Sequence, residues 1–228
     1  MFGLNLDSRT ITFQLLMINL AMFVIKIVLQ FTSGLDLDAF LGMYYVGSPQ
    51  FQPVQLVTHF FMHGGVFHIF FNMYTLVMFG ALLERVWGPQ RFLFFYLFTA
   101  LGAALLHQLV QGYEIYQISG TFFPETDQMA FIPELGFKLS IPTIGASGAV
   151  FGIMAGFALL FPNTELMLLF PPMPVKAKYL MIGLAAIELY SGLQNNPHDN
   201  VAHFAHLGGA LFGFLLIRYW NRQRNRLF

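Results

Sequence analysis

Residues 144–161 read IGASGAVFGIMAGFALLF, an apolar run without a charged side chain. Gly148, Gly152 and Gly156 recur every four residues, and Ser147 stands near the start. The run is close to the shortest length at which a helix can cross the hydrocarbon core of a bilayer. Glycines four apart give a helix a smooth stripe, against which another membrane helix can pack closely. The stretch therefore predicts a membrane helix that packs tightly and carries a serine at one end.

The composition of the whole chain supports a membrane protein. Of its 228 residues, 57% are hydrophobic and only 10% are charged, and the mean hydropathy is +0.63. A soluble domain carries roughly a quarter charged residues, so this chain has too little polar surface to cover a core. We expect lipid to surround it and, because the net charge is zero, we expect no nucleic-acid partner. The absence of cysteine excludes disulfides, thiolate catalysis and cysteine-ligated metals.

Five further apolar runs have spanning length, and backbone in lipid must be helical to satisfy its hydrogen bonds. The first of them is too long for a cleaved signal sequence, so we expect it to be retained. We predict an all-α, polytopic membrane bundle in which residues 1–228 form one domain. The six predicted spans are residues 11–31, 64–83, 91–110, 144–161, 175–193 and 201–217.

The cations divide the ends of these spans into two groups. One group comprises the N-terminus, the second and fourth connections and the tail, with Arg9, Arg85, Arg91, Lys176, Lys178, Arg218, Arg222, Arg224 and Arg226. The other three connections hold only Lys138 among many acids. Because cationic connections stay inside, both termini are expected in the cytoplasm. Two outside connections, residues 32–61 and 111–143, are long and rich in aromatic residues, so we expect short helices lying in the membrane interface.

Polar side chains within the spans are costly and therefore indicate function. His68 and Asn72 lie in the second span, Ser147 in the fourth, and His203 and His206 in the sixth. Each of these spans is predicted to start outside, so all five side chains fall at a similar depth. Three helices distant in sequence thus bring a hydroxyl, an amide and imidazoles to one level.

The spacing of these residues points to a serine nucleophile. A helix start directs free N–H groups and a positive dipole end at Ser147, which suits an oxyanion. His206 opens a second small-residue stripe, with Gly209 and Gly213 four apart. Close approach of the two stripes would let His206 take the proton of Ser147 as general base and return it as general acid. Packing motifs without function would leave the polar residue at the outer end of each stripe unexplained.

Two further residue sets complete the predicted site. His68 and Asn72 are four apart and share a helix face, so together they could stabilise an oxyanion or form a structural hydrogen bond. Glu188 is the only acid within a predicted span. It could pair with a histidine, but a gating or structural role fits equally well, and we expect no carboxylate at the level of the dyad. The mechanism is therefore expected to use two residues.

These motifs resemble those of the rhomboid family of intramembrane serine proteases. The resemblance rests on Gly145-Ala146-Ser147-Gly148, on His206 with Gly209 and Gly213, and on His68 followed by Asn72. The entry HFFMHGGVFH, residues 59–68, and Glu84-Arg85 before Gly88 are also similar to the family. The resemblance implies that Ser147 is the nucleophile and His206 the base. It also implies that His68 and Asn72 line the oxyanion hole, and that substrate enters near the fifth helix.

Two further positions bear on the resemblance to this family. Many members carry Trp-Arg in the first external loop, where this chain has Val54-Gln55; that difference bears on how the loop is seated rather than on catalysis. His203 lies three residues before His206, and only His206 has the family's glycine spacing.

The predicted function is hydrolysis of a peptide bond in or near the transmembrane segment of single-pass or polytopic membrane-protein substrates, without a cofactor or metal. The first alternative is an inactive relative that binds transmembrane helices. The second is a metal-dependent membrane protein using His59, His63, His68, His203 and His206, although no His-Glu-x-x-His motif occurs. We expect cleavage at small residues near helix-weakening positions, a polar cavity that admits water, and a bacterial inner membrane as the location.

Overall fold

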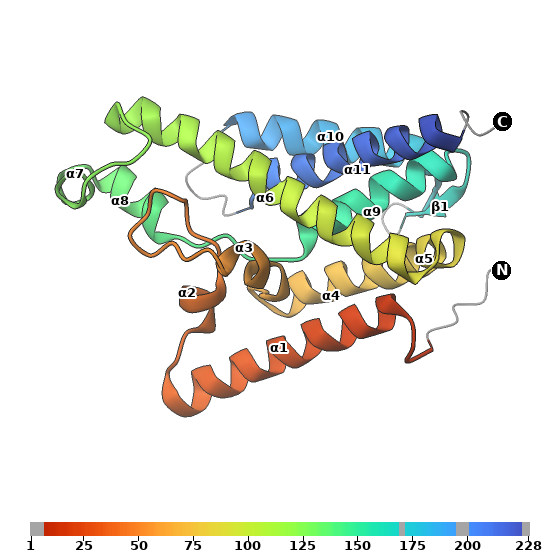
Figure 1. The fold of residues 1–228 in the computed structure, drawn as a ribbon, viewed down its shortest axis with the longest axis horizontal. Helices are drawn as coiled ribbons and strands as arrows, with labels where there is room; N and C mark the ends of the chain where they lie inside the picture. The colour runs from red at the N-terminus through yellow and green to blue at the C-terminus, as the bar shows by residue number, and fades with distance from the viewer. Residues whose placement is uncertain (1–6, 169–171, 195–200, 225–228) are drawn as a thin grey trace.

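The computed structural model describes residues 7–168, 172–194 and 201–224, which form a helical bundle (Figure 1). Each of the six predicted spans coincides with a helix. These helices are α1 (Ile11–Ser33), the continuous segment of α4 (Val66–Thr75), η2 (Leu76–Gly80) and α5 (Ala81–Trp87), α6 (Pro89–Ser119), α9 (Ser147–Leu160), α10 (Ala177–Gln194) and α11 (His203–Arg224). The all-α membrane bundle predicted from the sequence is confirmed.

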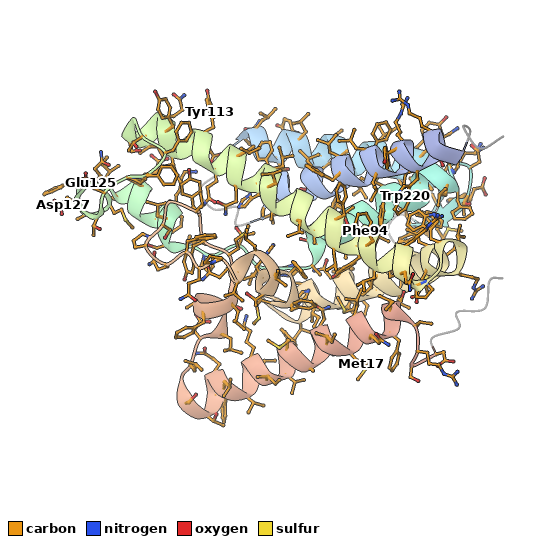
Figure 2. All side chains as sticks on the ribbon, viewed as in Figure 1. Met17, Phe94, Tyr113, Glu125, Asp127 and Trp220 are labelled. Carbon is orange, nitrogen blue, oxygen red and sulfur yellow. The ribbon has the colours of Figure 1, made fainter. Side chains whose placement is uncertain are left out.

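The number of spans stays a prediction. Within the described residues, three helices are long and apolar enough to cross a membrane, namely Ile11–Ser33, Val66–Trp87 and Pro89–Ser119. Helix α9 is apolar but shorter. Many outward side chains are apolar, including Met17 on α1 and Phe94 on α6, which are 47% and 54% exposed (Figure 2). Such exposure is expected where lipid rather than water is the surrounding solvent.

Helix α1 runs along one edge of the bundle (Figure 1). The buried carboxylate of Glu84 holds its first residues. Glu84 Oε1 accepts from the N–H of Ile11 at 2.7 Å, and Oε2 accepts from the N–H and hydroxyl of Thr12 at 2.8 and 2.7 Å. The first N–H groups of a helix have no carbonyl partner of their own, and a negative charge there is favoured by the helix dipole. Glu84 therefore joins the start of α1 to the end of the second helical segment.

Helices α6, α9 and α11 form the tightest part of the bundle. A Cβ placed on Gly152 of α9 would lie 2.5 Å from the side chain of Thr99 on α6, and one on Gly102 of α6 would lie 2.2 Å from Phe212 on α11. Small residues are needed at these crossings because the neighbouring atoms already occupy the space of a methyl group. The glycine stripes seen in the sequence thus mark real helix contacts.

The two long connections contain short helices, as the sequence predicts. The first holds α2 (Leu37–Leu41), α3 (Gln55–Thr58) and the 3-10 turn η1 (His59–Phe61), and the second holds α7 (Thr126–Phe131) and α8 (Pro133–Ser140). These elements gather at one end of the bundle, with Glu125 and Asp127 at its tip, while the start of α1 and the end of α11 lie at the opposite end (Figures 1 and 2). Whether these short helices lie in a membrane interface remains a prediction.

Hydrogen bonds fasten the first connection to itself and to the segment before α9. Gln55 is 1% exposed; its amide oxygen accepts from two backbone N–H groups of the loop, and its amide nitrogen donates to two loop carbonyls. Met43 and Thr143 exchange two backbone hydrogen bonds of 2.9 and 2.8 Å. The loop therefore has a polar centre of its own at Gln55, whereas the preceding Val54 is exposed.

Two features were not predicted. Strands β1 (Glu165–Met167) and β2 (Pro174–Lys176) form an antiparallel hairpin in the connection between α9 and α10, with Glu165 opposite Lys176. Helix α6 continues to Ser119, beyond the predicted end at Val110. Gly120 ends it with φ +75°, a left-handed conformation that glycine adopts without strain.

Candidate active site

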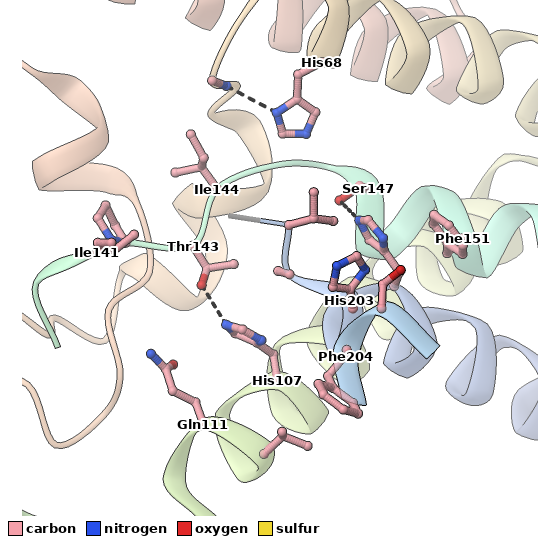
Figure 3. Close-up of a pocket in the computed structure, with 18 of the residues that line it drawn as sticks. His68, His107, Gln111, Ile141, Thr143, Ile144, Ser147, Phe151, His203 and Phe204 are labelled. Atoms are coloured by element: carbon pink, nitrogen blue, oxygen red, sulfur yellow. Dashed lines mark hydrogen bonds between the residues drawn. The ribbon is translucent and has the colours of Figure 1, made fainter. Parts of the chain in front are cut away.

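The structure brings the hydroxyl of Ser147 to the imidazole of His206. The distance from His206 Nε2 to Ser147 Oγ is 2.7 Å, and the dashed line at Ser147 in Figure 3 marks this contact. Ser147 is the first residue of α9, and His206 lies one turn into α11. A hydroxyl at this distance can donate to an unprotonated ring nitrogen, which is the arrangement of a nucleophile with its general base.

The backbone of the two helices fixes this distance. A Cβ on Gly209 would lie 1.8 Å from the carbonyl oxygen of Gly148, and a Cβ on Gly213 would lie 3.0 Å from that of Gly152. The backbones of α9 and α11 are therefore in direct contact along their glycine stripes. The separation of Ser147 and His206 depends on this contact rather than on flexible side chains.

Phe151 restrains the ring of His206 from the side. The two rings stack with centroids 4.4 Å apart and an angle of 4° between their planes. Phe151 follows Ser147 by four residues, so both side chains lie on one face of α9. Phe151 was not among the residues predicted from the sequence, although its position one turn after the serine was a usable signal.

The backbone before Ser147 turns through Gly145. Its φ is +128°, a conformation that residues with a side chain rarely adopt, and its N–H donates to the carbonyl of His59 at 2.9 Å. A Cβ on Gly145 would lie 2.8 Å from His68 Nε2 and 3.5 Å from Ser147 Oγ. Glycine therefore keeps open a space between the imidazole of His68 and the serine hydroxyl.

His68 and Asn72 of α4 both line the cavity that also contains Ser147. The N–H of Gly64 donates to His68 Nδ1 at 3.3 Å, which leaves the proton of a neutral ring on Nε2, the nitrogen next to Gly145. Asn72 is 5% exposed, and its Nδ2 has no hydrogen-bond partner among the described residues. A buried donor without a partner is costly, so the amide of Asn72 is a donor available to a ligand.

Glu188 corrects one prediction. We expected no carboxylate at the level of the dyad, yet Glu188 Oε2 lies 3.0 Å from His206 Nδ1 and 2.6 Å from His203 Nδ1. Glu188 therefore pairs with both histidines of α11. The signal in the sequence was the single acid in the outer half of an apolar helix, but the face of α10 on which it lies could not be derived from a helix that is apolar on nearly every side.

A cavity of about 980 Å³ opens over these residues (Figure 3). Its wall includes Ser147, His206, His68 and Asn72, and polar side chains of the second long connection continue it. One of these is Lys138, which pairs with Glu114 at 3.0 Å. A cavity of this size, with polar groups converging at one side, is typical of a ligand-binding site.

Three other described histidines, His59, His63 and His107, make contacts away from the serine hydroxyl. His59 Nδ1 contacts the carbonyl oxygen of Gln55 at 2.7 Å, and His107 Nε2 contacts the hydroxyl of Thr143 at 2.8 Å. His63 is buried beside His68, with ring centroids 5.1 Å apart. Across the described ranges, no group of three or more His, Cys, Asp or Glu side chains is arranged to hold a metal ion. The geometry of these residues therefore lends the metal hypothesis no support.

Comparison with known proteins agrees with the motifs. The family model for the Rhomboid domain matches residues 50–223, which include the serine, both histidines of α11 and the two polar residues of α4. This chain belongs to the rhomboid family. The family resemblance predicted from the sequence is confirmed.

Relatives include proteins from plants and from Providencia stuartii. The chain is 34% identical over 173 residues to "RHOMBOID-like protein 12, mitochondrial" and 30% identical over 174 residues to "Rhomboid-like protein 16, chloroplastic", both from Arabidopsis thaliana, with 76% of this chain covered in each case. It spans about half the length of these two, 47% and 50% respectively. "Rhomboid protease AarA" of Providencia stuartii is 28% identical over 232 residues, which cover 93% of this chain and 73% of that protein. One relative is thus named a protease, and two are named only as rhomboid-like.

Proposed function

We propose that this rhomboid is an intramembrane serine endopeptidase that cleaves membrane-protein substrates in or near a transmembrane segment. The observation that carries the proposal is the 2.7 Å contact between Ser147 Oγ and His206 Nε2 in the wall of a large cavity. A serine bonded to an imidazole, with the ring held by a stacked aromatic, has the parts of an activated nucleophile. The relative named a protease makes hydrolysis the natural chemistry for this pair.

In the proposed reaction, Ser147 Oγ attacks the carbonyl carbon of the scissile peptide bond while its proton passes to His206 Nε2. The tetrahedral intermediate then expels the amine, which leaves with that proton, and an acyl group remains on Ser147. A water molecule from the cavity then gives a proton to His206 and attacks the ester carbon. The second tetrahedral intermediate breaks its bond to Ser147 Oγ, which takes the proton back from His206, and the acid is released. His206 thus acts as base and acid in turn.

The negative oxygen formed in this attack needs donors. Three donors lie in the lining of the same cavity and suit this role: the N–H of Ser147 at the start of α9, the Nε2–H of His68 and the unpartnered Nδ2 of Asn72. The helix dipole favours a negative charge at the same place. We assign His68 and Asn72 to oxyanion stabilisation, where one donor is typically worth about 3 kcal/mol.

The substrate must expose a carbonyl that a helix would hide. Carbonyls of a regular helix are bonded within the helix, so the cleavage region has to unwind before Ser147 can reach it. We therefore expect small residues at the cut and helix-weakening residues nearby. Replacing this region with a leucine run should abolish cleavage; unchanged cleavage would show that unwinding is not required.

The experiment combines two readouts. Wild type, Ser147→Ala, His206→Ala and His203→Ala are purified in detergent, labelled with a fluorescent fluorophosphonate, and tested on a single-pass substrate in liposomes. We expect Ser147→Ala and His206→Ala to lose both labelling and cleavage, whereas His203→Ala keeps its labelling. A folded wild type that neither labels nor cleaves, but still retains the substrate, would favour the inactive helix-binding alternative.

We propose the predicted topology but not the predicted location. We propose six spans with both termini on the cation-rich side, and the lack of native cysteine makes a test direct. Single cysteines at Glu125 and at Lys178 should react with an impermeant maleimide from opposite sides of sealed vesicles; reaction from the same side would exclude this topology. The predicted bacterial inner membrane is not supported, since relatives named mitochondrial and chloroplastic also match this chain.

A further inference from the structure

Glu188 joins two histidines through one oxygen. Its Oε2 lies 2.6 Å from His203 Nδ1 and 3.0 Å from His206 Nδ1, and the three side chains are only 11–13% exposed. Both imidazoles lie on α11, one turn apart, whereas Glu188 comes from α10. The carboxylate therefore reaches across from a different helix to the ring that contacts Ser147.

The surroundings of Glu188 make this placement unusual. Its neighbours Ile187, Leu189 and Tyr190 are 61%, 47% and 66% exposed, so the adjoining surface of α10 is suited to lipid. A carboxylate in such a helix is expensive unless it is paired. Among the described residues, the ion pairs of Glu188 are with His203 and His206, so no Lys or Arg partner explains its presence in the helix.

The contact falls on the nitrogen that matters for catalysis. For His206 to accept the proton of Ser147 on Nε2, the neutral ring must carry its own proton on Nδ1. A carboxylate oxygen 3.0 Å from Nδ1 favours that tautomer and attracts the imidazolium that forms when Ser147 attacks. Nδ1 has no aligned hydrogen bond to a described residue, so this contact is electrostatic at rest; such contacts commonly tighten during reaction.

We propose that Glu188 is a positioning residue that extends the Ser147–His206 pair into a serine–histidine–glutamate set, with His203 as its anchor. The proton of Ser147 is transferred to His206 Nε2 and is not transferred further to Glu188, which remains a carboxylate. His203 holds the carboxylate of Glu188 through the shorter of the two contacts. Phe151 restrains the ring of His206 by stacking on it. This proposal rests on the proposed protease function and adds a fourth helix, α10, to the α4, α9 and α11 that already carry the proposed site.

The first test is Glu188→Gln, which keeps the size of the side chain and removes its charge. We expect kcat to fall about 10- to 100-fold, the usual range for a residue that orients another, with KM within about twofold. The kcat–pH profile should also change, because the neutral amide no longer attracts the imidazolium formed when Ser147 attacks. Other titratable or charged groups are also close: His68 and His107 lie near His206, and Glu114 and Lys138 line the cavity. A change in the kcat–pH profile is therefore assigned to Glu188 only if a control variant does not show it.

The control is Glu134→Gln, which makes the same chemical change on the exposed start of α8 and should leave kcat and its pH profile unchanged. A double-mutant cycle provides the second test. If His203 acts through Glu188, His203→Gln should lower kcat in the wild-type background and have little further effect in Glu188→Gln. Additive losses would overturn the anchoring role of His203. Should Glu188→Gln fail to fold, the effect of His203→Gln on the kcat–pH profile carries the test.

The outcomes separate this proposal from the function on which it rests. If Ser147→Ala cleaves as well as wild type, the protease function itself is wrong. If Ser147 is essential but folded Glu188→Gln keeps the wild-type kcat and pH profile, only the positioning role is overturned. A fall in thermal stability without a change in kcat would likewise assign Glu188 to structure alone.

Discussion

Gly209 of α11 lies directly against the backbone of Gly148 on α9, where a Cβ would stand 1.8 Å from the Gly148 carbonyl oxygen. Gly209→Ala must therefore push the two helices apart and lengthen the Ser147–His206 contact. Displacements of about 1 Å at a catalytic pair can lower the rate about 100-fold, so we expect a fall in kcat of at least that order. Cleavage and fluorophosphonate labelling measure it.

Gly183→Ala is the matched control for Gly209→Ala. It places the same methyl group on α10, where nothing lies within 4 Å of the added carbon, and alanine is the better helix former. We expect wild-type activity and unchanged or slightly higher stability. Equal losses in both variants would mean that the helix contact is not what sets the geometry of the pair.

Gly145→Ala should abolish cleavage for two reasons. The added Cβ would lie 2.8 Å from His68 Nε2, and the φ of +128° strains any residue with a side chain. Gly65→Ala is the control, because Gly65 has an extended backbone with φ 179° and open space around its α-carbon. Activity measured in liposomes should fall only for Gly145→Ala; a Gly145→Ala enzyme with normal kcat would remove the proposed oxyanion space.

Asn72→Ala should lower kcat about 100- to 1000-fold, the typical loss for one oxyanion donor, while KM changes little. Because Nδ2 has no hydrogen-bond partner among the described residues, its removal costs no such bond and the melting temperature should stay close to wild type. Tyr74→Phe, an exposed change on the same helix, should have neither effect. If Asn72→Ala lowered stability and left kcat intact, the amide would be structural.

Glu84→Gln tests the anchor of α1. The carboxylate accepts from two backbone N–H groups and one hydroxyl, and the amide can replace only part of this. We expect a loss of roughly 1–3 kcal/mol in stability, seen as a lower melting temperature in detergent, with near-normal kcat for the folded fraction. Glu165→Gln changes an exposed strand residue and should have the melting temperature of wild type. If Glu84→Gln also melts at the wild-type temperature, Glu84 contributes no net stability.

His63 should make the fold sensitive to acid. Burial, together with electrostatic repulsion from His68 and Lys26, lowers the pKa of His63 to about 3, whereas the pKa of an unfolded histidine is about 6.5. Below pH 6.5 the unfolded chain binds a proton that the folded protein does not, so stability falls as pH drops towards 3. The slope is at most about 1.4 kcal/mol per pH unit for this group.

The measurement for His63 is the melting temperature between pH 7 and pH 4. His63→Leu should flatten the curve, because the group that titrates on unfolding is gone. His59 also has its pKa lowered by burial, to about 4, so some acid sensitivity should remain. A curve for His63→Leu that runs parallel to wild type would mean that His63 titrates alike in both states.

Much of the fold follows from features that a sequence displays directly. Apolar runs of spanning length predicted the positions of the helices, and glycines four apart marked the contact of α9 with α11. The positions of Ser147 and His206 on these stripes were enough to expect their approach, because a backbone contact leaves little freedom to the residues beside it. Family membership then followed from the same motifs.

The features that could not be predicted depend on the rotation of a helix about its axis, on side-chain bonds to backbone groups, and on strands too short to show a pattern. Helix α10 is apolar around most of its surface, so no stripe showed that Glu188 faces α11. The polar centre at Gln55 bonds to backbone groups of its own loop, and such bonds carry no sequence pattern. The hairpin of β1 and β2 consists of three-residue strands, too short to show an alternation.

The direct backbone contact between Gly148 and Gly209 has a consequence for the membrane in which the protein works. Lipid-facing side chains adapt to bilayers of different thickness by tilting and bending helices, and such adjustments would disturb a site assembled from long side chains. Here the main chains of the helices that carry Ser147 and His206 touch at Gly148 and Gly209, so we expect the two residues to keep their separation when the outer helices adjust. The chemistry should therefore tolerate a change of bilayer thickness, while access of the substrate to the cavity, which depends on the outer helices, responds to it.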